Sequence, residues 1–247
     1  MLASAAAIYG VSASSAFDYS RIEVNGLEFT DAAAVEAALA GVRGENLFGL
    51  STGPLEATLE TLSTVESARV DISLPGTLAV TLEERTPVLI WQVGARRYLA
   101  DADGDLFALL GADPPAGAAG LPVIDDRRAA SVGLSVDRKL DAVDLDAATR
   151  LASLIPADVG SSAVSLAVVV TDANGFILDT RPKGWSAVFG FYTPSLRTTE
   201  LIPGQVRLLR SLLADREHLV ERVILASETD GTYTPRASPS AKPSKAP

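Results

Sequence analysis

The sequence lacks cysteine altogether and contains a single histidine, His218. The absence of cysteine excludes a disulfide framework, thiolate ligands for a metal ion and a cysteine nucleophile. A Ser-His-acid relay would have to use His218 and an activated serine. The G-x-S-x-G spacing occurs at residues 49–53, but it lies between two helical patterns and not at the strand-to-helix turn of a nucleophile elbow. We therefore predict a surface position for His218 and no catalytic residues, so the protein is not expected to be an enzyme.

Basic residues are also scarce relative to acidic ones. The 247 residues include 21 Lys and Arg against 31 Asp and Glu, which gives a formal net charge of −10. A nucleic-acid-binding protein needs a basic surface against the phosphate backbone, so nucleic acid is excluded as a partner. Peripheral binding to anionic lipid is disfavoured for the same reason. Hydrophobic residues make up 47% of the chain, which is enough for the core of one large or two small domains.

One group of acidic residues has part of a metal-binding pattern. Asp101, Asp103 and Asp105 alternate as the first three ligands of an EF-hand calcium loop do. That loop also requires Gly at its sixth position and Glu at its twelfth, where this chain has Leu106 and Ala112. We interpret the stretch as a turn between two strands, and we predict neither a metal nor a cofactor.

The stretch from Arg21 to Pro87 has the pattern of a small α+β module. Apolar and polar residues alternate in three short runs, which predicts half-buried strands at residues 21–25, 69–74 and 77–83. Pro75-Gly76 favours a turn between the last two runs. Two helical patterns lie between the first and second runs, one after Thr30 and one after Thr52. The predicted order is β-α-α-β-β, with both helices on one side of a three-stranded sheet.

The chain beyond Pro87 predicts a mixed β-sheet with flanking helices. Short apolar runs separated by turn residues are typical of strands, and helices are expected to start near Asp144 and Pro203. Strands are predicted at residues 88–93, 97–100, 106–110, 121–124, 165–171, 176–180, 185–192 and 220–226. Residues 229–247 are rich in Pro, Ser, Ala and Lys and are predicted to be disordered.

Several segments of the chain together resemble one known family. The segments IEVNG, GENLFGLS, LSTVESARVDISLPGTLAVTLEERTPV and YLADADGDLF are similar to the polypeptide-transport-associated (POTRA) domain and following β-domain of FtsQ/DivIB cell-division proteins. The resemblance covers residues 17–234 and implies a POTRA domain at residues 18–86 and an FtsQ-type β-domain at residues 87–228. Thr199–Gly204 stand where the family has a lysine-containing stretch, so contact residues of the family do not transfer directly.

Residues 1–17 form an uncharged segment rich in alanine and serine. As a helix it would be about 25 Å long, short of a hydrocarbon core of about 30 Å. It can be read as the end of a signal anchor whose beginning is missing, as a signal-peptide-like segment, or as a loose N-terminal helix. The resemblance favours a truncated single-pass membrane anchor, with the main domains extracytoplasmic and the protein at the division septum.

The last predicted strand is the expected partner-binding element. Nothing after it is patterned to cover its outer edge, and an uncovered edge accepts an incoming strand. The alternatives are that this strand is internal or that residues 227–233 fold back over it. One face of the predicted strand at residues 185–192 carries Trp185, Phe189 and Phe191, and we expect this face to lie in the core. Tyr192 then lies on the opposite, exposed face. The predicted partner-binding residues are Tyr192, Arg222, Val223, Ile224, Leu225 and Ala226.

The resemblance implies a non-catalytic scaffold of the bacterial division machinery. Its expected partners are single-span proteins of the FtsB and FtsL type, bound by strand addition, and through them the septal peptidoglycan synthesis machinery. One alternative is a POTRA-containing outer-membrane assembly or secretion protein, which predicts several such modules or a long barrel. The other is an extracytoplasmic hydrolase, which predicts a convergent catalytic cluster.

Overall fold

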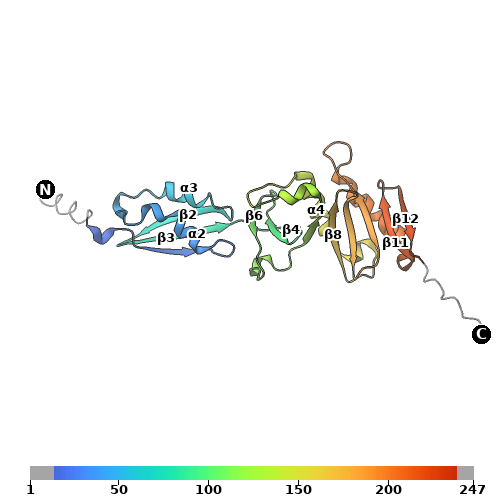
Figure 1. Cartoon of the computed structure of the whole chain (residues 1–247), viewed down its shortest axis with the longest axis horizontal. Helices are drawn as coiled ribbons and strands as arrows, with labels where there is room; N and C mark the ends of the chain where they lie inside the picture. The colour runs from blue at the N-terminus through green and yellow to red at the C-terminus, as the bar shows by residue number, and fades with distance from the viewer. Residues whose placement is uncertain (1–13, 238–247) are drawn as a thin grey trace, which may run out of the picture. The chain divides into compact units, whose positions relative to one another are not determined.

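The computed structural model describes residues 14–237, and these form two units (Figure 1). The first unit extends to Pro87 and also includes Leu110–Ala119. The second unit consists of Val88–Leu109 and the chain from Gly120 onward. The predicted anchor falls mostly on residues 1–13, which lie outside the described residues. None of the helices within residues 14–237 has the length and hydropathy that crossing a membrane requires.

The first unit is a three-stranded sheet with two short helices, as predicted. Its strand order is β1-β3-β2, with β1 parallel and β2 antiparallel to β3. The elements are β1 (Arg21–Asn25), α2 (Ala32–Ala38), α3 (Gly53–Leu59), β2 (Val65–Ser73) and β3 (Thr77–Glu84), with 3-10 turns at Ser15–Phe17, Ala40–Val42 and Leu47–Gly49. The predicted β-α-α-β-β order is therefore confirmed.

A single apolar cluster fills the first unit. Val35 of α2 and Leu59 of α3 pack with Leu78 and Val80 on the central strand, and all four side chains are buried. Burying one such side chain fully stabilises the fold by about 2 kcal/mol. Asp31 caps α2, because its carboxylate accepts the backbone N–H of Ala33 at 2.9 Å. The period-two pattern of the sequence thus corresponds to the buried face of this sheet.

The second unit contains a nine-stranded mixed sheet. Its order is β12-β11-β10-β9-β8-β7-β4-β5-β6. The β4–β7, β7–β8 and β10–β11 pairs are parallel and the others antiparallel. The strands are β4 (Leu89–Val93), β5 (Arg96–Ala100), β6 (Leu106–Leu109), β7 (Val123–Asp126), β8 (Ser165–Thr171), β9 (Gly175–Arg181), β10 (Ser186–Gly190), β11 (Val220–Leu225) and β12 (Gly231–Pro235).

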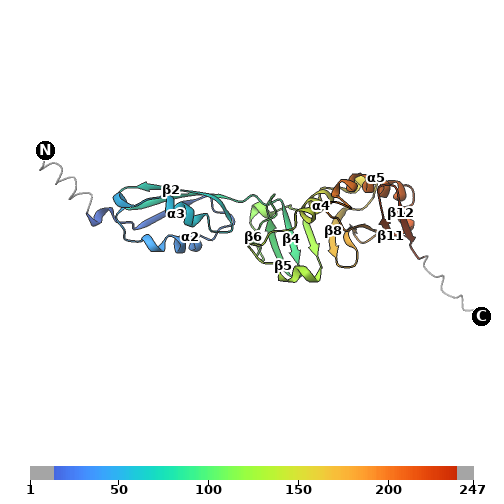
Figure 2. The same ribbon diagram turned by 90° about the horizontal axis from the view of Figure 1, so that it is seen from above.

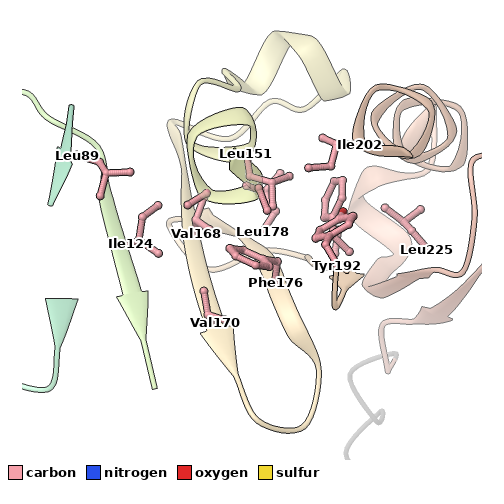
Figure 3. Packing of buried hydrophobic residues seen from close by; sticks show 14 of the residues in the cluster. Leu89, Ile124, Leu151, Val168, Val170, Phe176, Leu178, Tyr192, Ile202 and Leu225 are labelled. Atoms are coloured by element: carbon pink, nitrogen blue, oxygen red, sulfur yellow. The ribbon is translucent and has the colours of Figure 1, made fainter. Parts of the chain in front are cut away.

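Two helices, α4 (Ala142–Ala152) and α5 (Ile202–Leu213), cover one face of this sheet (Figure 2). Short 3-10 segments occur at Ala116–Ala118, Ala129–Gly133, Pro156–Val159, Thr199–Leu201 and Glu217–Leu219. Leu151 of α4 packs among Val168, Phe176 and Leu178 of the sheet (Figure 3). The predicted mixed sheet with flanking helices is confirmed, and its core lies between these helices and the sheet.

Two predictions about chain segments need correction. Disorder was predicted from residue 229 onward, but Gly231–Pro235 form β12, because pairing with β11 gives this polar stretch backbone partners. Residues 238–247 lie outside the described residues.

The loop at residues 110–119 was expected to belong to the second region, but it is part of the first unit, where the backbone N–H of Gly117 donates to Glu28 Oε1 at 2.6 Å.

Candidate partner-binding edge

The two sheets present four edge strands, and β12 differs from the other three. The outer side of β6 is occupied, because Leu106 N–H donates to the Arg138 carbonyl and Asp137 N–H donates to the Leu106 carbonyl, both at 2.9 Å. β2 is contacted along its outer side by side chains of the α3 segment. β1 carries the exposed charged residues Arg21 and Glu23, which discourage strand pairing.

Strand β12 pairs with β11 on one side only, and within residues 14–237 no strand lies on its other side. Its central side chains are uncharged, and Tyr233 is 44% exposed. An uncharged edge with free backbone groups is the arrangement that accepts a further strand. The open edge of the second sheet is therefore β12.

The prediction that Arg222–Ala226 form the open edge is wrong. β11 lies between β10, with which it is parallel, and β12, with which it is antiparallel. The chain reverses at residues 227–230, where the N–H groups of Ala226 and Ser227 donate to the Asp230 carbonyl at 2.9 and 3.0 Å. Asp230-Gly231 followed by alternating threonines is a hairpin signal that could have predicted this return.

The side chains of β11 are divided between the core and the sheet surface. Val223 and Leu225 are buried against the helices, whereas Ile224 is 45% exposed on the opposite face. Arg222 donates from Nη2 to Asn174 Oδ1 at 2.7 Å. The Ala226 carbonyl accepts a hydrogen bond from Arg197 Nη1. These residues support the hairpin rather than forming its outer edge.

Tyr192 is buried, so its predicted exposure is also wrong. It is 9% exposed while Phe191 is 49% exposed, the reverse of the prediction. The reason is Gly190, which has a φ of 91° and lies at a register irregularity between β9 and β10. That bulge shifts the alternation by one residue. Burial raises the pKa of the Tyr192 hydroxyl, although the nearby Arg197 guanidinium lowers it.

Behind the β11–β12 hairpin, two side chains join the ends of β10 and β11. Strand pairing between them stops at Val188 and Ile224. Beyond that point, Arg197 Nη2 donates to the Phe189 and Leu225 carbonyls at 2.8 and 2.9 Å. Gln205 Nε2 donates to the same carbonyls at 3.2 and 3.1 Å. We call this pair of side chains the Arg197–Gln205 clasp.

The clasp was missed by the sequence analysis, although one signal was present. Gln205 occupies a position on the apolar face of α5, between Ile202 and Leu209, and it is buried there. A polar residue on an apolar helical face must find partners in the core. Its Oε1 accepts the hydroxyl hydrogen of Tyr192 at 2.7 Å, which explains the buried position of that tyrosine.

Replacing Gln205 with leucine is expected to destabilise the second unit by about 1–3 kcal/mol, because the Tyr192 hydroxyl is left buried without its acceptor. Urea unfolding measures this change. The matched control is the double variant Gln205→Leu with Tyr192→Phe, which removes both partners and should recover part of the loss. Equal stability of wild type and Gln205→Leu would contradict the role of the clasp.

The opposite end of β12 is held by a second polar group. Arg236 N–H donates to the Leu219 carbonyl at 2.6 Å, and Arg236 Nη2 donates to the Gly184 carbonyl at 2.9 Å. Beside it is a pocket of ≈ 330 Å³ lined by residues that include Lys183, Glu217 and His218. These contacts fix the residue that follows β12 to the end of the β9–β10 turn.

Glu217 accepts hydrogen bonds from four donor groups beside this pocket. It accepts from the Ser161 hydroxyl, from Ser162 Oγ and N–H at 2.8 and 3.0 Å, and from Trp185 Nε1 at 2.9 Å. Burial by itself would raise the pKa of Glu217, but these hydrogen bonds outweigh it and lower the pKa to about 2. The two serines therefore donate directly to the Glu217 carboxylate, whereas a hydrolytic relay would place His218 between a serine and the carboxylate.

Glu217 should make stability depend on pH in acid. Its pKa is lower in the folded chain than its ordinary 4.5, so its contribution is complete above that value and is lost as the pH falls toward about 2. We expect wild type to lose more stability than Glu217→Gln between pH of about 5 and about 2. Denaturant unfolding across this range tests it. Parallel losses in the two proteins would show that Glu217 does not contribute in this way.

The other residues singled out by the sequence have structural positions. Asp101 Oδ1 accepts the N–H groups of Asp103 and Asp105 at 3.0 and 2.9 Å, which forms the predicted turn. His218 is exposed, as predicted. In the part of the chain that the structure describes, no group of three or more His, Cys, Asp or Glu is arranged to hold a metal ion.

Comparison with known proteins gives a consistent set of relatives. Residues 17–85 match the POTRA domain, FtsQ-type. The cell division protein FtsQ of Chloroflexus aurantiacus is 26% identical over 227 residues, or 92% of this chain and 73% of that protein. FtsQ of Chloroflexus aggregans is 29% identical over 62% of this chain and 54% of its own length. FtsQ of Mycobacteroides abscessus is 36% identical over 36% of this chain and 28% of its own length.

Proposed function

We propose that this chain, which matches the FtsQ-type POTRA domain and is similar to cell division proteins FtsQ, is a non-catalytic scaffold of the division machinery. In this proposal it binds single-span division proteins of the FtsB and FtsL type by accepting a strand from them on β12. Through these partners it supports septal peptidoglycan synthesis. The N-terminal segment holds it at the cytoplasmic membrane, with both units on the outer side.

The observation that carries the proposal is the open edge of β12. Ala226 N–H donates to the Asp230 carbonyl, which fixes the alternation of hydrogen bonds in the hairpin. Thr232 then lies in a hydrogen-bonded pair with Ile224, and the backbone groups of Gly231 and Tyr233 point away from β11. These outward groups are the ones that an added strand would use.

The surroundings of β12 indicate the chemistry of the incoming strand. Leu208 and Leu212 of α5 lie beside Gly231, and Tyr233 is paired with the buried Val223 on the same face of the sheet. Thr232 and the exposed Ile224 lie on the other face. A partner strand with apolar residues on the α5 side and polar residues on the other side would therefore extend this sheet best.

The cellular role can be tested with a fluorescent fusion of the complete protein in dividing cells. We expect the fusion to concentrate at the constriction site and to recover FtsB-type and FtsL-type proteins when it is purified from membranes. A fusion that spreads evenly around the cell and recovers neither protein would contradict the proposed function.

A further inference from the structure

The outer side of β2 in the POTRA domain is closed by side chains from the α3 segment. Val70 N–H donates to Glu56 Oε1 at 2.9 Å, and Ala68 N–H donates to Glu60 Oε1 at 3.3 Å. Within residues 14–237, β2 has a strand partner, β3, on its other side only. We infer that Glu56 and Glu60 block strand addition at the β2 edge, because they occupy the backbone N–H donors that an incoming strand would need.

The spacing of the two glutamates matches the spacing of the two amides. Glu56 and Glu60 are four residues apart at the end of a helix, so they lie on the same face and are separated by about 6 Å along its axis. Ala68 and Val70 are two residues apart on a strand, and their N–H groups point the same way at a separation of about 6.8 Å. A helix packed along the strand can therefore satisfy both donors at once.

The same contacts disfavour an approaching strand electrostatically. A carboxylate that accepts from a backbone N–H forms a charge-assisted hydrogen bond, which is stronger than the neutral bond that would replace it. An incoming strand would also have to bring its carbonyl oxygens to the place held by these negative charges. The ion pair between Arg69 and Asp71 at 3.2 Å further places charged side chains on β2 itself.

The glutamates on the outer side of β2 make this edge different from the β12 edge of the second unit. Both sheets have an edge strand of five or more residues, but the β2 edge has carboxylates on its donors and the β12 edge has uncharged side chains. If the glutamates are removed, the freed β2 edge is expected to pair with β2 of a second copy of this chain. A second copy is the expected occupant because it supplies an identical edge that is freed at the same time.

The test compares the complete chain with the double variant Glu56→Ala with Glu60→Ala. We expect amide exchange at Ala68 and Val70 to become roughly tenfold faster at low protein concentration, because each amide loses its acceptor. At higher concentration we expect dimers in analytical ultracentrifugation. The matched control is Glu36→Ala with Glu45→Ala, which removes the same charge from exposed positions of the same domain outside β2 and should change neither measurement.

A second variant separates blocking of the β2 edge from a general loss of structure. Glu56→Gln with Glu60→Gln keeps an acceptor oxygen at each position, so it should keep part of the protection at Ala68 and Val70 and remain monomeric. Unchanged exchange in the alanine variant would overturn the inference. Faster exchange without any self-association would overturn the inference as well, because the glutamates would then not be what prevents strand addition on β2.

Discussion

Replacing Tyr233 with proline is expected to weaken strand addition on β12 more than tenfold while the protein stays folded. The Tyr233 N–H points away from β11, so the change removes a donor that an added strand would use and no hydrogen bond within the hairpin. Proline is tolerated on an edge strand whose N–H faces solvent. We expect affinity for a peptide from an FtsB-type partner to fall more than tenfold, as measured by calorimetry.

Two control variants separate the backbone effect from other losses. Tyr233→Ala keeps the N–H and removes only the exposed ring, so it should weaken binding less than the proline variant does. Thr232→Pro removes a donor that faces β11, so it should lower the stability of the hairpin itself. Undiminished binding by Tyr233→Pro would show that the partner does not add a strand to β12.

Replacing Asp126 with asparagine should destabilise the second unit by about 3–5 kcal/mol, because it breaks a buried ion pair. Asp126 is 0% exposed at the end of a central parallel strand. It accepts hydrogen bonds from Trp91 Nε1 at 3.0 Å, Ser131 Oγ at 2.6 Å and Arg128 Nη2 at 2.9 Å. An asparagine places an NH₂ group among these donors and leaves the guanidinium without its charge partner on that side. Urea unfolding measures the difference.

The neighbouring residue provides the control for that experiment. Asp125 pairs with Arg127 at 2.6 Å, but this ion pair is partly exposed to solvent. Asp125→Asn should therefore change the free energy of unfolding by no more than about 1 kcal/mol. Similar losses for the two variants would show that burial of Asp126 is not what makes its contacts important. The unfolding of the POTRA domain should be unaffected in both.

The POTRA domain could be predicted from the sequence because its signals are local. The alternation of apolar residues in β2 and β3 is explicit, and the turn residues between them are adjacent in the chain. The helices carry Val35 and Leu59 at positions that face the sheet. Each element is thus specified by its own residues, and the global fold agrees with the local preferences.

The candidate site could be predicted only in part, because two local rules were overridden. Composition suggested disorder after residue 229, but pairing with β11 supplies the partners that Gly231–Pro235 lack in isolation. Alternation suggested that Tyr192 is exposed, but the bulge at Gly190 reversed it. Both errors concern the same end of the sheet, and the corrected edge lies one strand farther along than predicted.

The buried polar contacts could not be predicted because they join distant parts of the chain. Gln205 and Arg197 reach carbonyls on β10 and β11, and Asp126 binds a tryptophan 35 residues earlier in the chain. A sequence shows that a polar residue stands in an apolar pattern, but not which partner satisfies it. Such groups are the places where sequence patterns are least informative.

The most direct measurement is amide exchange along β12 with and without a peptide from an FtsB-type partner. If a strand is added there, exchange at Gly231 and Tyr233 should slow strongly, while Thr232, already bonded to β11, should change little. A complex in which Gly231 and Tyr233 exchange as fast as in the free protein would contradict strand addition on β12.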